Sequence, residues 1–175
     1  YHLTGNVQPE VRPELGRALS IWGDSGWGSR VRDGKYQDRF FSEDLINACV
    51  SMIEEWDPQP APTWVTNIAS ERHPDLVPSF AKRLAQALDL PYVSTLSCSP
   101  SSGERSAMAN SVQRARSLDG TMSVDSALVQ EGPVLLVDDL VDTRWTMAIG
   151  SWLLRSNGSG LVYPMALAYM GWRSG

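Results

Sequence analysis

The spacing of apolar residues changes after a proline-rich stretch at residues 57–62 (DPQPAP). Beyond it, short segments with strand character alternate with segments of helical spacing. We expect strands at 63–69, 91–96, 133–137 and 161–168, and helices at 76–88 and 143–156. Alternating strands and helices are typical of a parallel sheet covered by helices, so the sequence predicts an α/β fold.

Before residue 57 the apolar spacing is helical, and we expect helices at 13–22, 29–39 and 43–56. Pro13 suits a first helical turn. Ser42 suits an N-cap, with Glu43 and Asp44 beside the positive end of the helix dipole. The third helix should bury one apolar face, made of Leu45, Ile46, Cys49, Val50, Ile53 and Trp56. We therefore expect a helical appendage or linker region over residues 1–60 and a main domain over residues 61–175.

Composition narrows the function classes. Hydrophobic residues make up 42% of the 175 residues and charged residues 20%, as in ordinary globular domains. No apolar run approaches the roughly 18 residues of a membrane span, and no secretion signal opens the chain, so no membrane partner is expected. Cys49 and Cys98 form neither a disulfide framework nor a metal motif, which favours a cytoplasmic setting. The net charge of −5 predicts weak DNA binding by this chain alone. The missing initiator Met predicts a piece of a longer protein.

Residues 133–147 (PVLLVDDLVDTRWTM) carry the strongest chemical pattern. We expect Asp138 and Asp139 to end a buried strand, and a helix to begin at Thr143. Ligands bind beyond the carboxyl ends of strands in such sheets. Unpaired amides and the dipole at a helix N-terminus favour an anion there. Carboxylates suit sugar hydroxyls or a metal ion, so the combination predicts a site for a ribose 5-phosphate.

Three other interpretations compete. The acids could form a solvated loop with an N-cap, and this alternative stays open. They could be the magnesium-binding acids of a P-loop ATPase, but Lys35 follows Gly34 without the earlier glycine or the following Ser or Thr. No motor is therefore expected within this chain. A receiver-type phosphoacceptor pocket would need a lysine near a later strand, and no lysine follows Lys82.

The segment LLVDDLVDTRWT, residues 135–146, resembles the signature of type I phosphoribosyltransferases. The resemblance implies a three-layer fold with a central, mainly parallel sheet. It implies that Asp138 and Asp139 hold the ribose 2′- and 3′-hydroxyls, and that Asp142 is the catalytic residue, an acidic side chain placed near the reacting centre. It also implies Mg²⁺ bound with phosphoribosyl pyrophosphate (PRPP), with the two aspartates as candidate metal ligands. The implied 5′-phosphate loop consists of Asp142, Thr143, Arg144, Trp145 and Thr146.

Two further features belong to this resemblance. Arg144 stands where these enzymes have glycine, and it is strained if the position needs a positive φ. Alternatively its guanidinium adds to anion binding. Upstream, Ser70 and Arg72 follow a strand as the pyrophosphate loop does, which makes them candidate ligand-binding residues. His73 is a candidate base without an identifiable partner acid. An ordinary surface turn remains the alternative for this loop.

A broader set of segments resembles the carboxy-terminal region of actinobacterial RecQ-family DNA helicases and the ComF group of phosphoribosyltransferase-like proteins. They are LGRALSIWGDSGWGSRV, SERHPDLVPSFAKRLAQALDLP, SAMANSVQRARSLDG and LLVDDLVDTRWTMAIGSWLLR. The resemblance implies a polypeptide whose ATP-hydrolysing helicase motor acts in DNA repair and recombination. The partners it implies are those motor domains, DNA through the parent protein, and a phosphoribosyl or nucleotide ligand. Asn110, Gln113 and Arg114 would line the site, or else form an exposed helix face.

Three functions are consistent with these observations. The first is a PRPP- or nucleotide-binding accessory domain on a RecQ-like helicase. The second is an active, Mg²⁺-dependent phosphoribosyltransferase. The third is a vestigial site in a protein- or DNA-interaction domain, in which Trp22, Trp27 and Trp56 would form a contact face if they are not core residues.

Overall fold

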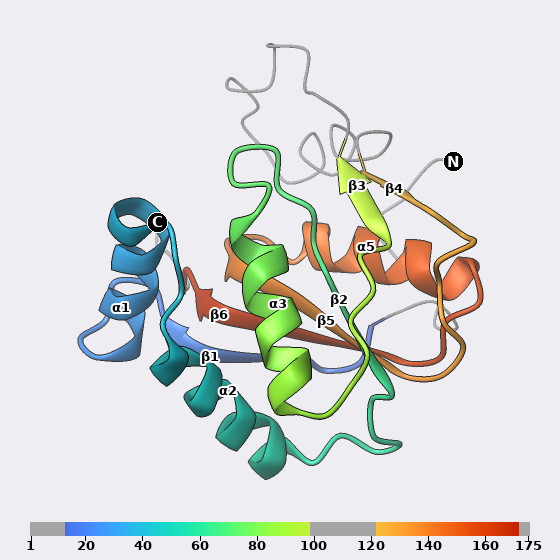
Figure 1. Ribbon diagram of the computed structural model, residues 1–175, viewed down its shortest axis with the longest axis horizontal. Helices are drawn as coiled ribbons and strands as arrows, with labels where there is room; N and C mark the ends of the chain where they lie inside the picture. The colour runs from blue at the N-terminus through green and yellow to red at the C-terminus, as the bar shows by residue number, and fades with distance from the viewer. Residues whose placement is uncertain (1–12, 99–121, 172–175) are drawn as a thin grey trace.

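The computed structural model describes residues 13–98 and 122–171. Four parallel strands form the main sheet in the order β1-β6-β5-β2 (Figure 1). Their bounds are β1 Arg17–Ile21, β2 Trp64–Asn67, β5 Val134–Val141 and β6 Val162–Tyr169. A separate antiparallel pair consists of β3, Leu96–Cys98, and β4, Met122–Val124.

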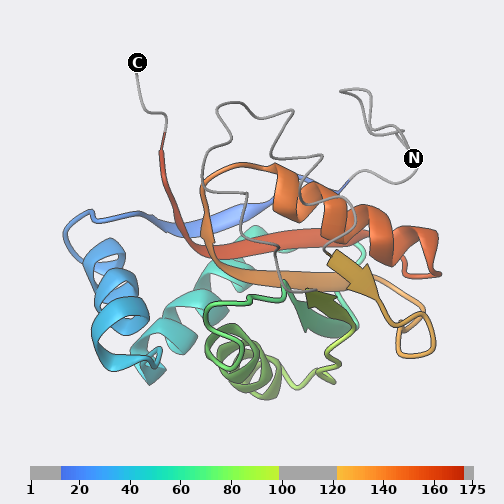
Figure 2. The same cartoon turned by 90° about the horizontal axis from the view of Figure 1, so that it is seen from above.

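Helices cover both faces of the main sheet. Helices α2 (Glu43–Trp56) and α3 (Leu76–Ala87) lie on one face, and α5 (Trp145–Ser156) lies on the other (Figure 2). Helix α1 (Trp27–Asp33) continues directly into a π-helical turn, η2 (Gly34–Asp38). The arrowheads of β1 and β6 point towards the side where α1 lies (Figure 1). The predicted α/β class is confirmed as a three-layer arrangement.

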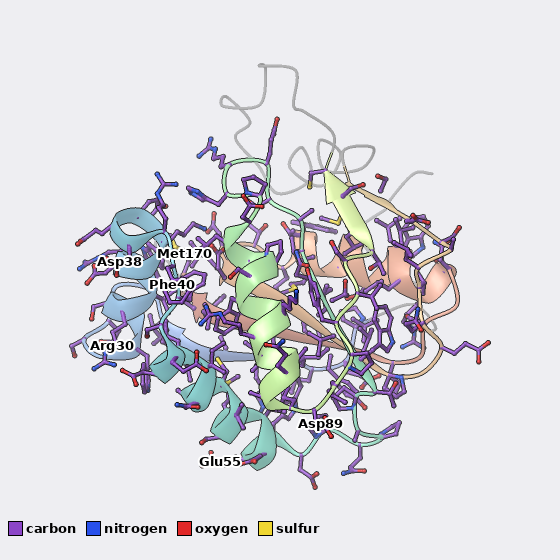
Figure 3. All side chains as sticks on the ribbon, in the orientation of Figure 1. Arg30, Asp38, Phe40, Glu55, Asp89 and Met170 are labelled. Carbon is purple, nitrogen blue, oxygen red and sulfur yellow. The ribbon has the colours of Figure 1, made fainter. Side chains whose placement is uncertain are left out.

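The core follows from the alternation of apolar side chains along β5. Leu135 and Val137 face α2 and α3, whereas Val134 and Leu136 face α5, as expected for successive residues of a strand. All four side chains are fully buried, because helices cover both faces of this strand. Side chains fill the space between the layers, while Arg30 on α1 and Glu55 on α2 point outwards (Figure 3).

Most elements expected from periodicity are confirmed. Helix α2 begins after Ser42, as predicted, although the Ser42 side chain makes no capping hydrogen bond. Of the apolar face predicted for α2, Leu45, Ile46, Cys49 and Ile53 are buried, and Val50 and Trp56 pack partly against the core. Burial raises the pKa of the Cys49 thiol to about 12, so this thiol is neutral and acts as a packing group.

The helix predicted at residues 13–22 is wrong, because Arg17–Ile21 is a strand. It pairs in parallel with β6, with Ala18 opposite Ala166. A helix this short is marginal in isolation, so hydrogen bonds to the open edge of β6 outweigh its local preference. Leu19 packs partly against the core in this conformation.

The strand expected at residues 91–96 is also replaced. Tyr92 makes a single parallel bridge to Val65, and the strand pairing resumes only in β3. The first 60 residues contribute β1 to the main sheet and α2 to the same core as α3. The division of the chain at residue 60 into two domains stays a prediction.

None of the helices in the described parts of the chain combines the length and apolar character needed to cross a bilayer.

Candidate functional site

Strand β5 does not end at the two acids, contrary to the sequence prediction. It continues to Val141, with Asp138 opposite Ala166 and Val141 opposite Tyr169 of β6. The extension arises because β6 is equally long and supplies hydrogen-bonding partners along the whole edge. Helix α5 accordingly begins at Trp145 rather than at Thr143. Asp138 and Asp139 still lie close to the carboxyl end of the strand, where α/β sheets bind ligands.

The two carboxyls occupy different surroundings although they are adjacent in sequence. The amide of Asp139 donates a 2.8 Å hydrogen bond to Oδ1 of Asp138. Asp139 is buried, with 5% of its surface exposed, whereas Asp138 keeps some accessible surface. Enclosure by protein atoms and the neighbouring Asp139 carboxylate raise the pKa of Asp138 well above its ordinary value. Asp138 therefore tends to keep its proton, and a protonated carboxyl can donate a hydrogen bond as well as accept one.

Lys35 is the residue that sequence reasoning missed at this site. Its Nζ lies 2.8 Å from Oδ2 and 3.0 Å from Oδ1 of Asp139. The side chains are only 15% and 7% exposed, respectively. Lys35 belongs to η2, far from Asp139 in sequence. The available signal was its rarity, since Lys35 and Lys82 are the only lysines of the chain.

The backbone amides where helix α5 begins are a second feature of this edge of the sheet. Ala148 donates its amide to the carbonyl of Arg144. Among the described residues, the amides of positions 143 to 147 find no acceptor, as expected for the first turn of a helix. Thr143 and Thr146 are half-buried beside them. The predicted 5′-phosphate loop is therefore placed at the positive end of the α5 dipole.

Arg144 adopts an ordinary backbone conformation. Its φ of −72° and ψ of −5° lie in the right-handed helical region. The strain expected for a non-glycine residue at this position is absent, because that strain requires a positive φ. The Arg144 side chain is exposed and lines a cavity of about 450 Å³ between α5, β1 and β6.

The Ser70–His73 loop lies at the same edge of the sheet. The amide of Ile68 bonds to the carbonyl of Val137, so the chain leaving β2 passes beside the acids. Within the loop, the His73 amide donates to Oγ of Ser70 at 3.3 Å. Within the described ranges, Ser70 and Arg72 make no hydrogen bond or ion pair with the two acids, and Arg72 is exposed. The fold therefore places Ser70 and Arg72 near the acid pair, but without a direct hydrogen bond or ion pair to it in the described residues.

His73 connects this loop to η2. Its Nδ1 accepts a 2.6 Å hydrogen bond from the Arg39 guanidinium, since arginine can only donate. Burial, followed by the charges of Arg39 and Lys35, lowers the pKa of His73. At neutral pH the ring is then uncharged, with Nδ1 as the acceptor. A role of His73 as a base stays a prediction.

The comparisons with known proteins concern the fold. No family model matches the chain, and no curated protein matches it. Among solved structures, adenine phosphoribosyltransferase from Leishmania tarentolae superposes with a TM-score of 0.51 at 15% identity, over 90% of this chain and 94% of that one. The chain has the fold of the type I phosphoribosyltransferases.

Two other solved structures are similar to this phosphoribosyltransferase-like fold. Purine phosphoribosyltransferase from Pyrococcus horikoshii has a TM-score of 0.48 at 17% identity, over 86% of this chain and 77% of that one. Orotate phosphoribosyltransferase from Aeropyrum pernix has a TM-score of 0.46 at 20% identity, over 74% and 62%. Asn110, Gln113 and Arg114, which the sequence suggested as site residues, lie outside the described residues.

The phosphoribosyltransferase resemblance implies Mg²⁺. The surroundings of Asp138 and Asp139 show whether these two side chains suit a magnesium ion. Both carboxylate oxygens of Asp139 are already within 3.0 Å of an ammonium group. Asp138 is held towards its neutral form, which is a poor cation ligand. Within the described ranges no three His, Cys, Asp or Glu side chains gather as a metal-binding group. The acid pair does not fit a resident Mg²⁺.

Proposed function

We propose that this chain binds the ribose 5-phosphate portion of PRPP or of a nucleotide. The observation that supports the proposal is the juxtaposition of two groups at one edge of the sheet. The acids of β5 offer acceptors and a donor to sugar hydroxyls. One turn further along, the amides of residues 143 to 147 and the α5 dipole offer a phosphate site.

The roles follow from this arrangement. Asp138 and Asp139 hold the 2′- and 3′-hydroxyls, and the loop from Asp142 to Thr146 holds the 5′-phosphate. Thr143 and Thr146 add hydroxyl donors next to the amides. Ser70 and Arg72, on the loop after β2, bind the group that leaves the anomeric carbon. Of these two, Arg72 has the positive charge that suits a diphosphate.

Titration calorimetry tests the proposal directly. Ribose 5-phosphate, PRPP and nucleoside monophosphates should bind to the wild type, while free ribose should bind much more weakly. Asp138→Ala, which removes both the donor and the acceptor, is expected to weaken ribose 5-phosphate binding about tenfold, since a hydrogen bond between neutral groups contributes about 0.5–1.5 kcal/mol. Asp138→Ala/Asp139→Asn should weaken it more, whereas Asp138→Asn alone keeps a donor and an acceptor and should weaken it less.

The matched control is Asp38→Asn, which removes an exposed carboxyl on η2 and should leave the affinity unchanged. Circular dichroism of each variant must show a folded protein. Absence of wild-type binding at millimolar ligand would contradict the proposal. It would favour the alternative of a vestigial site in an interaction domain.

Within the same proposal, the chain is an accessory domain of a RecQ-like ATP-dependent DNA helicase. The segment resemblance supports this, and the incomplete P-loop is consistent with a motor located elsewhere in the polypeptide. An antibody raised against this chain should then detect a polypeptide several times longer than 175 residues in cell extracts. Detection of a product of only this length would contradict the helicase assignment.

A transferase reaction is the second candidate function. The unstrained backbone at Arg144 favours a transferase reaction. Arginine stands here where the family has glycine, and it fits the proposed phosphate loop without steric cost. Asp142 would then act near the anomeric carbon as its positive character develops. Release of pyrophosphate from Mg²⁺–PRPP in the presence of a base or amine should be lost in Asp142→Asn. Binding of PRPP without any release would exclude turnover.

A further inference from the structure

Lys35 makes the closest contact to the acid pair of any described side chain outside β5. Its Nζ touches both oxygens of the Asp139 carboxylate, at 2.8 and 3.0 Å. A contact to both oxygens places a full positive charge where a divalent cation would sit on a carboxylate. The ion pair is nearly enclosed, with 15% of the lysine and 7% of the aspartate side chain exposed, so solvent screens it little.

The position of Lys35 is fixed by packing around it. The neighbouring Gly34 is buried, and an added Cβ there would lie 2.8 Å from the Phe41 ring. Phe41 itself packs edge-to-face on Phe80 of α3. Val31, one turn before, is fully buried in the same core. The ammonium is therefore carried on a rigid turn and does not depend on a flexible surface side chain.

The charges facing the pair come from three elements. Asp138 and Asp139 belong to β5, Lys35 belongs to η2, and His73 with Arg72 lies on the loop after β2. His73 is held neutral by its surroundings. The Arg39 guanidinium donates a hydrogen bond to Nδ1 of His73. In the described parts of the chain, Lys35 is thus the cation in direct contact with the acid pair, through Asp139.

We propose that Lys35 is a positioning residue that replaces a metal ion at the acid pair, so that the two carboxyls engage ribose hydroxyls without a divalent cation of their own. The inference rests on the proposed ribose 5-phosphate site. It adds that this site needs a positive charge beside the Asp139 carboxylate, which Lys35 supplies. Lys35 orients the Asp139 carboxylate and balances its charge. Any Mg²⁺ that enters with a diphosphate then belongs to the ligand.

The first test uses metal alone. Free Mn²⁺ is measured by electron paramagnetic resonance during titration of the full chain. Wild type and Lys82→Met should leave Mn²⁺ free, because Lys82 is exposed on α3. Lys35→Met should bind Mn²⁺ at least about tenfold more tightly than wild type, and adding Asp139→Asn should abolish the gain. Mn²⁺ binding by wild type that Asp139→Asn removes would overturn the inference, as would Lys35→Met without a gain.

The second test uses ribose 5-phosphate in calorimetry, with EDTA or with Mg²⁺. Wild type should bind equally in both, and Lys35→Arg, which keeps the charge, should do the same. Lys35→Met should bind about tenfold more weakly in EDTA and recover with Mg²⁺. A wild type that needs Mg²⁺, or a Lys35→Arg variant that behaves like Lys35→Met, would overturn the inference.

The wild-type comparison requires no variant, so poor folding of Lys35→Met does not remove the test. Failure of the proposed function is distinguishable from failure of this inference. Without a ribose 5-phosphate site, wild type binds no ligand in either buffer, while the Mn²⁺ titration still reports on Lys35. With the site but without the role of Lys35, ligand binding is normal and the metal dependence differs.

Discussion

Asp138, proposed above to bind a sugar hydroxyl, carries a cost in stability at neutral pH. Its pKa lies well above the ordinary value of 3.8, mainly because of burial and secondly because of Asp139. The folded state then holds the proton more tightly than the unfolded state. The contribution of Asp138 to the free energy of unfolding is greatest below about pH 3.8 and is lost as the pH rises through the raised pKa.

Asp138→Asn should remove this pH dependence, because an amide has no proton to lose. We expect the variant to be more stable than wild type at neutral pH and to match it in acid. Urea unfolding from about pH 4 to about pH 8 measures the difference. The control Asp38→Asn alters an exposed carboxyl and should follow the wild-type curve. A constant difference between Asp138→Asn and wild type at every pH would contradict the raised pKa.

At the residue scale the sequence pointed to the acids and the proposed phosphate loop, but not to the contact that Lys35 makes with Asp139. The aspartates and the loop are contiguous, so a local pattern can identify them. Lys35 meets Asp139 only through the fold, and the sequence offered it solely as a failed P-loop lysine. The backbone of Arg144 was equally beyond prediction, because whether a loop needs a positive φ depends on its three-dimensional path.

At the scale of elements, α1 and η2 together position Lys35 beside the sheet. Gly28 at the start of α1 lies so close to the end of β1 that an added Cβ would overlap the carbonyl oxygen of Ile21. The contact is to backbone, which cannot rotate away. The close approach of α1 to β1 therefore depends on the missing side chain.

Gly28→Ala should push α1 away from β1 and displace η2 with it. We expect a loss of about 1–3 kcal/mol in the free energy of unfolding, the usual cost of overpacking. Urea denaturation measures it. Arg32→Ala, at an exposed position of the same helix, is the control and should change stability little. A Gly28→Ala variant as stable as wild type would show that α1 is not held by this contact.

Elements with long, regular patterns were predictable, and short ones were not. Helices α2 and α3 bury clear apolar faces, so their sequences identify them within a residue or so. Strand β1 has helical spacing in its apolar residues, yet its edge position beside β6 decides its conformation. Propensity is a weak influence on a segment of five residues when a neighbouring strand offers hydrogen bonds.

At the scale of the whole molecule, the first and last parts of the described chain share one core. Phe41 and Leu45 lie in the same buried cluster as Phe80 and Leu135. Helix α2 covers a face of the sheet that would otherwise meet water. The sequence predicts a helical appendage over residues 1–60 because the apolar spacing changes after residues 57–62, and this division stays a prediction.

A fragment of residues 61–175 should therefore fail to fold by itself. It would expose the face that α2 covers and would lack β1, so its apolar burial would fall short of the entropy cost of folding. Thermal unfolding followed by circular dichroism should show no cooperative transition. Addition of a peptide spanning residues 13–56 should restore one. A cooperative transition of the fragment alone would instead support the division at residue 60.

The pairing of β1 with β6 constrains the order of events during synthesis. Within this domain β1 leaves the ribosome well before β6, the strand with which it pairs. A contact between such distant segments forms slowly. Until β6 has been synthesised, β1 lacks the strand with which it pairs. Lys35, which follows β1 closely in sequence, cannot take its place beside Asp139 before β1 is paired. Assembly of the candidate site is thus one of the final steps in the biogenesis of this domain.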